Sequence, residues 1–477
     1  MNILKPIKNK YTQSKFIQSF SQLAIGEIGA RFFNIFTNII LARYLAPERY
    51  GEYSYLLTYI AIFGTIASLG LRQLLIREIA RHPESTKLYL SISLFWRIIG
   101  IIISLIIFIL FQHIIGESTT TTLFILLFAA IISESFWDML QNIAMGLQRL
   151  KITSIINIAT AGSILIVYIL TPPNYISVEY VLLILVVSYL LRDIIYYLLL
   201  KKNKFFTGTY NFHLKNPMYI NILKDSFPFY ILVLFGLLTN QFPIIFLKMN
   251  SGEAAVAFFN TANKILLPMT LLFNTALAAF FPNQALLFQN DKIAFGKQTK
   301  KAITFIVYFG IGMCFCISLF RSEIIYILYG DLYKTAGDVI SYQCWYFVLF
   351  AIFSINGSVL GAANQQKKLS YLSILYAIIS TPILYIFSYY GAEGIAKGYI
   401  IASTLNMLII FPNIIKISFK QITIKFSIRL FTFLLVILIV STLIPQNIPL
   451  YIRICILILA VYIIYINKSS LKQHISI

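Results

Sequence analysis

Four polar residues recur along one side of an apolar segment near the N-terminus. They are Glu27, Arg31, Asn34 and Asn38. A helix turns by about 100° per residue, so this spacing places all four on one face. Glu27 precedes Arg31 by one turn, where the two side chains can form an ion pair. Ionisable groups inside a bilayer are costly, so the face indicates either the wall of a wet cavity or hydrogen bonding to neighbouring helices.

A second polar face is expected in the segment 254–281. It carries Asn260, Asn263, Lys264, Thr270 and Asn274. Lys264 has no carboxylate on its own segment, and its predicted depth matches that of Arg31. Two cations facing one space would attract a polyanion such as a phosphate or pyrophosphate. The alternative is a static pair between Lys264 and Glu27 or another acid.

A third polar face belongs to the segment 121–143. It carries Glu134, Asp138 and Gln141. Carboxylates one turn apart repel, so one is protonated or a cation lies close by. Arg97 is the expected partner. Arg192 could lie at a similar depth but is a less suitable partner, because it is near enough to the end of its segment to reach the interface instead. We interpret this face as a structural ion pair and keep proton or sodium coupling as the alternative.

These faces define two sets of candidate residues. Asn240 and Gln241 join the first set because they lie just before Pro243, where a bend would expose them. The candidate substrate-binding residues are Arg31, Lys264, Asn34, Asn38, Asn240, Gln241, Asn260, Asn263 and Asn274. The candidates for ion coupling are Glu27, Glu134 and Asp138.

Long apolar segments must position these residues. The 477-residue chain is 59% hydrophobic and only 12% charged, which excludes an ordinary soluble protein. Fourteen segments are long enough to cross about 30 Å of hydrocarbon as helices. They are 20–42, 53–71, 88–111, 121–143, 152–171, 179–200, 226–247, 254–281, 302–320, 338–362, 369–389, 393–415, 427–444 and 450–467.

The distribution of basic residues predicts the orientation of the chain. Most of the 38 Lys and Arg lie in alternate loops and in both tails. By the positive-inside rule, both termini are expected in the cytoplasm of a bacterium, with the protein in its inner membrane. An anionic leaflet then accounts for the net charge of +21, and no nucleic-acid partner is expected.

Several kinds of chemistry are not expected. The four Cys and four His are too scattered for a disulfide framework or a metal site. The longest loop, 201–225, is too short to fold alone. Any chemistry must therefore lie within the helices, and no cofactor is expected beyond a coupling proton or sodium ion.

Two pairs of short segments indicate an internal repeat. The pairs are 41–54 with 247–260, and 146–151 with 361–368. The offsets are similar and predict a six-helix unit that is used twice, in residues 1–205 and 206–420. Parallel repeats of this kind enclose a central cavity in several transporters. Residues 421–477 are expected to form an appended helix pair and a cytoplasmic tail.

The segment Leu41–Arg81 resembles a signature of polysaccharide-export flippases. It reads LARYLAPERYGEYSYLLTYIAIFGTIASLGLRQLLIREIAR, with a Pro-Glu-x-Tyr-Gly turn and an Arg-Glu ending. Gly146–Lys151 resembles the family pattern and Gly361–Lys368 matches it more loosely, so the likeness extends over about residues 15–420. The chain is therefore similar to Wzx-type O-antigen and capsule flippases of the multidrug/oligosaccharidyl-lipid/polysaccharide exporter superfamily.

This resemblance implies alternating access around a cavity lined mainly by the first, second, seventh and eighth spans. The implied substrate is an undecaprenyl-pyrophosphate-linked oligosaccharide. Arg31 and Lys264 match the implied cavity by span and depth, not by a motif. Arg43 matches the turn motif, and its expected place at the membrane edge indicates a structural role.

Two other functions are weighed against the flippase. An ion-coupled exporter of drugs or small cations would have an acidic cavity with few basic residues. A polysaccharide polymerase or ligase would carry a sizeable outward loop, whereas the largest one expected is 321–337. The expected protein is thus a transporter rather than an enzyme, acting as a monomer among membrane lipids, with a polysaccharide polymerase and a chain-length regulator as candidate partners.

Overall fold

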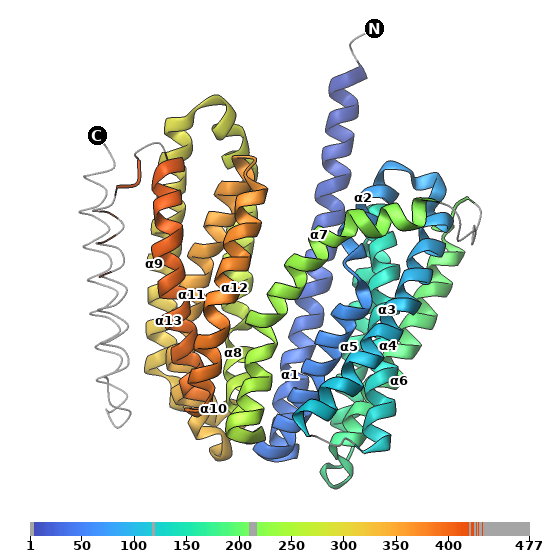
Figure 1. The fold of residues 1–477 in the computed structure, drawn as a ribbon, viewed down its shortest axis with the longest axis vertical. Coiled ribbons are helices and arrows are strands. Elements are labelled where there is room, and N and C mark those ends of the chain that lie inside the picture. The colour runs from blue at the N-terminus through green and yellow to red at the C-terminus, as the bar shows by residue number, and fades with distance from the viewer. Residues whose placement is uncertain are drawn as a thin grey trace. The chain divides into compact units, whose positions relative to one another are not determined.

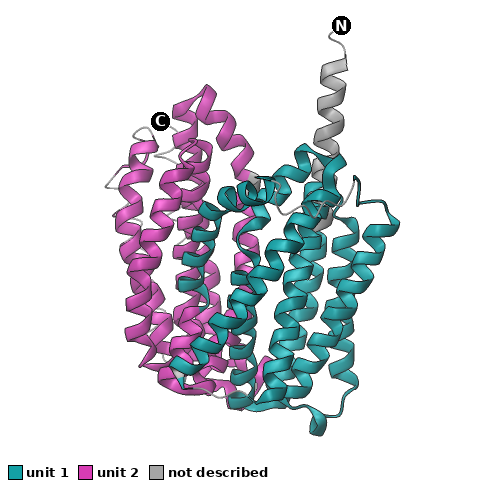
Figure 2. Cartoon of the chain, turned by 45° about the vertical axis from the view of Figure 1, so that its right-hand side comes forward, with its two compact units in different colours: residues 1–241 teal, residues 242–477 magenta. Residues whose placement is uncertain are grey.

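A computed structural model describes residues 4–116, 120–208 and 217–418, followed only by 421–423, 426, 428 and 432, with side chains described from Ile25 onward. Within these ranges the regular structure is helical and contains no strand, which confirms the predicted all-α class. The chain divides into two compact units, residues 1–241 and 242–477 (Figure 2). The predicted repeat, with limits at residues 205 and 420, was defined by counting spans and divides the chain differently. Those limits stay predictions.

Unit 1 is a bundle of helices (Figure 1). Its helices are α1 (Leu4–Ser68), α2 (Leu71–Arg81), α3 (Thr86–Ile115), α4 (Thr121–Gly146), α5 (Lys151–Leu170), α6 (Val178–Lys202) and α7 (Pro217–Asn240). Within it, α1 packs against α3, α4 and α5, and α4 also packs against α6 and the short α2.

Unit 2 has its core around one central helix. Its helices are α8 (Phe242–Asn290), α9 (Lys292–Leu319), α10 (Arg321–Tyr329), α11 (Lys334–Ala362), α12 (Gln366–Ser388) and α13 (Gly391–Ile417). The central helix is α11, which packs against α8, α9 and α13. Two short 3-10 turns of unit 1 and one of unit 2 complete the described elements: Pro83–Ser85, Pro173–Tyr175 and Asp331–Tyr333.

The helices α1 and α8 each contain one sharp break. Ala46 breaks α1 with φ 57° and ψ 170°, directly before Pro47. Gly252 breaks α8 with φ 82° and ψ 179°. In the predicted repeat, the segments 41–54 and 247–260 place these two residues at the same position. Each long helix therefore contains two runs joined by a turn of the same backbone conformation.

The described chain contains ten helical segments that are long and apolar enough to cross a membrane. Two of them, Ile25–Ser68 and Pro217–Asn290, each cover most of two predicted spans, so each of the first twelve predicted spans overlaps one of the ten segments. The last two predicted spans, 427–444 and 450–467, lie almost entirely outside the described residues, as does the appended pair.

The seventh span was predicted as one helix over 226–247, and this is wrong. Helix α7 ends at Asn240 and α8 begins at Phe242. Pro243 explains the break, because it has no backbone N–H to donate and it disfavours a helical conformation at the residue before it. The boundary between the two compact units lies at the same point.

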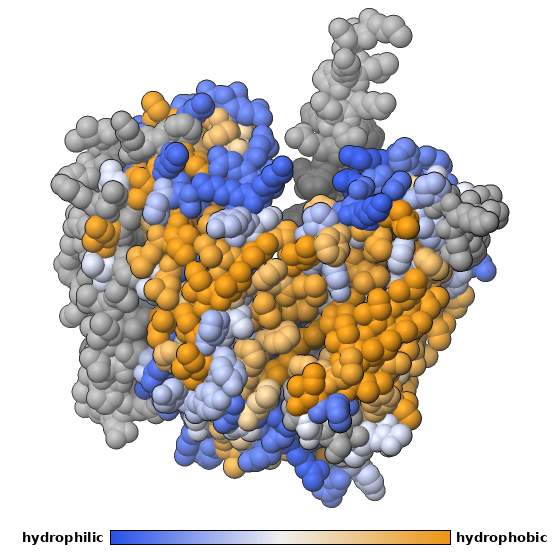
Figure 3. All heavy atoms as spheres, in the orientation of Figure 1, coloured by the Kyte–Doolittle hydropathy of each residue, from blue (hydrophilic) through white to orange (hydrophobic). Residues whose placement is uncertain are grey.

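Apolar side chains also cover the outside of the helices. On α3, Ile98, Ile102, Ile106 and Ile109 form an exposed stripe. Figure 3 shows a hydrophobic surface over the middle of the helices and hydrophilic residues near their ends. A water-soluble protein rarely exposes so large an apolar surface, whereas lipid covers it without cost. The chain is a multi-pass membrane protein.

Candidate functional site

The polar face of α1 is linked by contacts among its own residues. Arg31 Nε lies 3.6 Å from Glu27 Oε2, which confirms the predicted ion pair. Both side chains are about 40% exposed. Asn38 Nδ2 donates to the Asn34 carbonyl oxygen at 2.5 Å, and Tyr50 Oη donates to Asn38 Oδ1 at 3.1 Å. The face thus remains partly open to its surroundings.

Glycines on the opposite side explain how α1 is held. A Cβ atom added at Gly26 would lie 2.5 Å from Cβ of Ser154, and one at Gly29 would lie 3.0 Å from Ile158. Only glycine allows α5 to approach this closely. This close packing holds the glycine side of α1 against α5, so the polar residues face away from α5.

A hydrogen bond joins the polar face of α8 to α11. Gln343 Nε2 donates to Asn263 Oδ1 at 2.5 Å, and Gln343 is buried. This contact was not predicted from the sequence. Asn260 and Lys264 are half-buried, and Asn274 is exposed. Asn263 therefore has a structural partner, and the other members of the face are at least partly accessible.

The candidates at the end of α7 differ from each other. Asn240 is exposed, and its Nδ2 donates to the Gly236 carbonyl oxygen at 2.8 Å. Gln241 is half-buried in the break between helices. Arg31 belongs to unit 1 and Lys264 to unit 2, so the cavity that these two cations are predicted to share stays a prediction.

Asp138 on α4 lies at the centre of an ion-pair network in unit 1. Arg97 Nη2 lies 2.5 Å from its Oδ2, which confirms the predicted partner. Asn142 Nδ2 donates to the same oxygen at 3.1 Å. Arg97 also donates to the carbonyl oxygen and hydroxyl of Ser135. Arg72 on α2 approaches the other carboxylate oxygen at 3.5 Å, a contact that the sequence analysis missed.

Glu134, one turn earlier on α4, pairs with Arg192. The distance from Arg192 Nη1 to Glu134 Oε1 is 3.1 Å, and Arg192 Nε lies 3.1 Å from Asp193 Oδ1. The guanidinium carbon lies 4.3 Å from the ring centres of both Trp137 and Tyr189. The expectation that Arg192 reaches the interface is therefore wrong, since its side chain is only 6% exposed.

Burial of Arg192 has a clear physical cause. Two carboxylates and two aromatic rings replace the water that the guanidinium gives up. The residues Tyr189, Arg192 and Asp193 lie three and four positions apart on α6, so they share the face that packs against α4. Ser133 on α4 completes the contact by donating a hydrogen bond to Asp193. The adjacent Arg192-Asp193 pair was the sequence signal for this contact.

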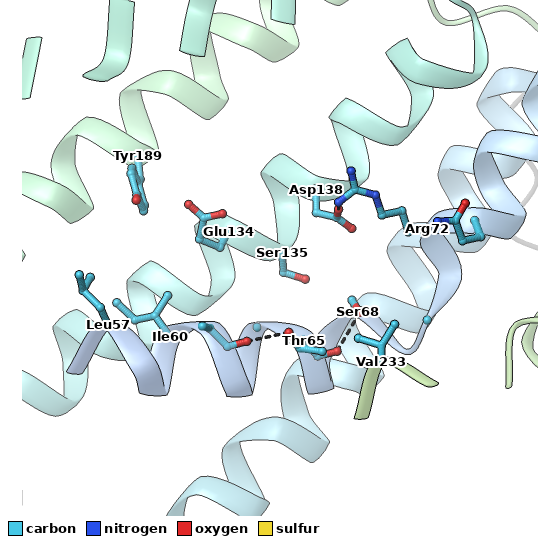
Figure 4. A pocket seen from close by; sticks show the side chains of 14 residues that line it. Leu57, Ile60, Thr65, Ser68, Arg72, Glu134, Ser135, Asp138, Tyr189 and Val233 are labelled. Atoms are coloured by element: carbon cyan, nitrogen blue, oxygen red, sulfur yellow. Dashed lines mark hydrogen bonds and ion pairs between the residues drawn. The ribbon is translucent and has the colours of Figure 1, made fainter. Parts of the chain in front are cut away.

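A cavity of about 540 Å³ opens beside this network. One wall is polar and the other is largely apolar. The lining residues are Leu57, Ile60, Ala61, Gly64, Thr65, Ser68, Gly70, Arg72, Gln73, Glu134, Ser135, Asp138, Tyr189 and Val233. Figure 4 shows the carboxylates of α4 on one side and the α1 residues on the other. All of these residues belong to unit 1.

Comparison with known proteins decides the family. The family described as "polysaccharide biosynthesis protein" matches residues 16–288. The chain belongs to this family. The matched region contains every candidate residue of the polar faces, from Glu27 to Asn274.

Two curated relatives have names that fit the family. The capsular polysaccharide biosynthesis protein CapF of Staphylococcus aureus is 26% identical over 385 residues, which cover 78% of this chain and 93% of the relative. A Shigella dysenteriae protein named as an O-antigen transporter is 28% identical over 275 residues, covering 55% of this chain and 65% of the relative.

Solved structures share the fold at low sequence identity. The lipid II flippase MurJ in an inward closed conformation has a TM-score of 0.66 and 16% identity, covering 94% of this chain and 98% of its own. An inward-facing multidrug transporter of the MATE family has a TM-score of 0.64 and 15% identity, covering 84% and 98%. The fold of this polysaccharide biosynthesis protein is therefore the one shared by these transporters.

Proposed function

We propose that this protein is a flippase for undecaprenyl-pyrophosphate-linked oligosaccharide repeat units. It moves them from the cytoplasmic to the outer leaflet of the bacterial inner membrane by alternating access, for the synthesis of O-antigen or capsule. The observation that carries the proposal is the family match, combined with a fold that agrees with a lipid II flippase over 94% of this chain. The names of the two curated relatives support the same substrate class.

In this proposal Arg31 and Lys264 bind the pyrophosphate. Arg31 contacts Glu27 through one nitrogen at 3.6 Å and its side chain is 40% exposed, so its other N–H groups can reach phosphate oxygens. The asparagines of the two faces bind the glycan, because amides both donate and accept hydrogen bonds with hydroxyl groups. The prenyl chain stays in the lipid.

The test is complementation of a deletion strain. Arg31→Ala and Lys264→Ala are each expected to lower surface polysaccharide by roughly 10-fold or more, the value of a charge-assisted hydrogen bond. Lipid-linked repeat units should accumulate at unchanged protein level. Lys202→Ala, which removes an exposed cation at the end of α6, is the matched control and should retain full export. Full export by both alanine variants would refute the role of these cations.

A proton or sodium gradient is the proposed energy source. Glu134 and Asp138 each contact an arginine, which already supplies the positive charge that a coupling ion would bring. We infer that coupling through either carboxylate requires its arginine pair to open, whereas the Glu27–Arg31 pair is longer and more exposed and needs less rearrangement. Collapse of each gradient with a selective ionophore, followed by measurement of new surface polysaccharide, tests this step.

The same proposal places the protein in a sequence of reactions. Glycosyltransfer on the cytoplasmic face supplies the substrate. A polysaccharide polymerase and a chain-length regulator consume the product on the other face and are the proposed partners. Both termini lie in the cytoplasm, according to the basic residues of the alternate loops.

A further inference from the structure

The cavity of unit 1 differs from the polar faces of α1 and α8 in its construction. Its polar wall is fixed by ion pairs rather than left open. Asp138 is held by Arg97 at 2.5 Å, and Glu134 is held by Arg192 at 3.1 Å. Side chains held in this way keep their positions when a ligand arrives, which lowers the entropy lost on binding.

The charges around the cavity are balanced. Three arginines and three carboxylates form the network: Arg72, Arg97, Arg192, Glu134, Asp138 and Asp193. A balanced cluster offers little net attraction to a lone phosphate or to a lone cation. Its groups instead present acceptors and donors in alternation, an arrangement that suits a ligand with many hydroxyl groups.

Hydrogen-bonding capacity remains on the polar wall. Among the described residues Glu134 is bonded only to Arg192, through one of its two oxygens, and its side chain is 32% exposed. Gln73 on α2 is exposed and has no hydrogen-bond partner in the described part of the chain. Arg72, whose side chain is 47% exposed, adds further N–H donors.

The opposite wall is suited to the C–H faces of a sugar ring. Leu57, Ile60 and Ala61 of α1 and Val233 of α7 supply its apolar surface, whereas the ring of Tyr189 lies beside Glu134 (Figure 4). The volume of about 540 Å³ lies within the range of roughly 300–1,000 Å³ that is typical of small-molecule sites. Most such sites combine apolar walls with a few fixed polar groups.

We propose that this cavity binds one neutral sugar residue of the transported glycan. This subsite lies within unit 1, and its lining includes neither Arg31 nor Lys264, the cations proposed to hold the pyrophosphate. It rests on the proposed function and extends it, since it assigns recognition of the glycan to Glu134, Gln73 and Arg72. Selection among glycans then depends on the shape of this cavity.

Gly64 allows the cavity to be filled without a clash. A Cβ atom added there meets no atom within 4 Å, and the residue lies inside a helix and lines the cavity. Gly64→Leu should therefore occupy the space of the ligand while the fold persists. Gly312 on α9 is a matched control, because a Cβ atom there also meets nothing within 4 Å and the residue belongs to unit 2.

The probe is the phosphate-free oligosaccharide that mild acid releases from the lipid-linked intermediates of a deletion strain. Its binding to purified full-length protein is measured by saturation-transfer NMR and titration. We expect binding to wild type, roughly tenfold or more weaker binding to Gly64→Leu, and wild-type binding to Gly312→Leu. Gln73→Ala, a change on the exposed face of α2, should weaken binding severalfold. This variant tests the subsite if Gly64→Leu does not fold.

Three results would overturn the subsite. They are equal affinity of wild type, Gly64→Leu and Gln73→Ala; no binding of the oligosaccharide to wild type; and binding of inorganic pyrophosphate, but not of the oligosaccharide, that Gly64→Leu abolishes. The proposed function is judged separately by surface polysaccharide in the deletion strain. If the surface polysaccharide is lost but the oligosaccharide does not bind, only the subsite is refuted. If the surface polysaccharide is unchanged, the proposed function is refuted.

Discussion

Ion pairs are distributed differently in the two units. In unit 1 the pairs of Arg97 and Arg192 lie within helices α3, α4 and α6, and both arginine side chains are less than 10% exposed. The ion pairs of the described part of unit 2 lie near helix ends or beside the break of α8 at Gly252, and each includes a partner whose side chain is at least 39% exposed. They are Lys248–Glu253, Arg321–Asp338, Lys334–Asp331 and Lys397–Glu393.

The difference indicates where polar function is concentrated. Buried charge inside a membrane protein is costly and persists only where it is compensated or used. In unit 2 a neutral hydrogen bond, from Gln343 to Asn263, joins α11 to α8. Unit 1 therefore bears the larger electrostatic cost, beside the cavity that we assign to the glycan.

Arg192→Ala is expected to have the largest effect on this comparison. The change leaves Glu134 and Asp193 without their shared cation, so the free energy of unfolding should fall by roughly 3–5 kcal/mol. The thermal midpoint of the purified protein in detergent measures the loss. Lys397→Ala, which breaks a half-exposed pair with Glu393 in unit 2, is the control and should cost less than about 1 kcal/mol. Equal losses would mean that the two interiors do not differ as described.

Arg97→Met tests whether the second buried pair is structural. This single change should lower the free energy of unfolding by about 2–5 kcal/mol. The loss should lie toward the lower end of that range because Arg72 and Asn142 still contact Asp138. The double variant Arg97→Met/Asp138→Leu removes both charges and should recover most of the stability. Surface polysaccharide is measured in parallel. Recovered stability with export still absent assigns Asp138 to transport, and recovery of both assigns it to the fold alone.

Much of the fold could be predicted from the sequence. The apolar segments were long enough to be read directly, and each of the first twelve overlaps a described helix, although the seventh crosses the break between α7 and α8. The Glu27–Arg31 pair was predictable because the two residues are one turn apart on one helix. The Arg97–Asp138 pair was predictable because a carboxylate in an apolar segment needs a cation and Arg97 was expected at similar depth.

What the sequence could not supply is the rotation and register of one helix against another. Periodicity shows that residues share a face, but not which neighbouring helix meets that face. This is why the contacts of Arg192 with Glu134, of Arg72 with Asp138 and of Gln343 with α8 were missed. The cavity of unit 1 depends on five segments at once and was beyond such reasoning.

Gly252→Ala and Ala46→Gly compare the two turns that share a position in the repeat. Both residues adopt positive φ with ψ near 170–180°, a region that only glycine occupies without strain. Gly252→Ala should destabilise the protein by about 1–3 kcal/mol, and Ala46→Gly should stabilise it. The thermal midpoints should move in opposite directions. Shifts of the same sign would show that the two turns are not equivalent.

The smallest expected effect concerns the neutral contact of unit 2. Asn263→Ala removes the acceptor for Gln343 Nε2 and should cost about 1 kcal/mol. Gln343 Oε1 is buried and has no hydrogen-bond partner in the described part of the chain, so Gln343→Leu loses no hydrogen bond at that oxygen. The double variant should therefore be nearly as stable as wild type, as measured by the thermal midpoint.

Export by the same double variant then decides the role of Asn263. If this asparagine only joins α8 to α11, surface polysaccharide should return together with stability. If it binds the glycan, export should stay low in a protein of normal stability. The second result would place a glycan contact in unit 2 and weaken the contrast with unit 1, because neutral amides would then recognise the substrate as well as the charged network does.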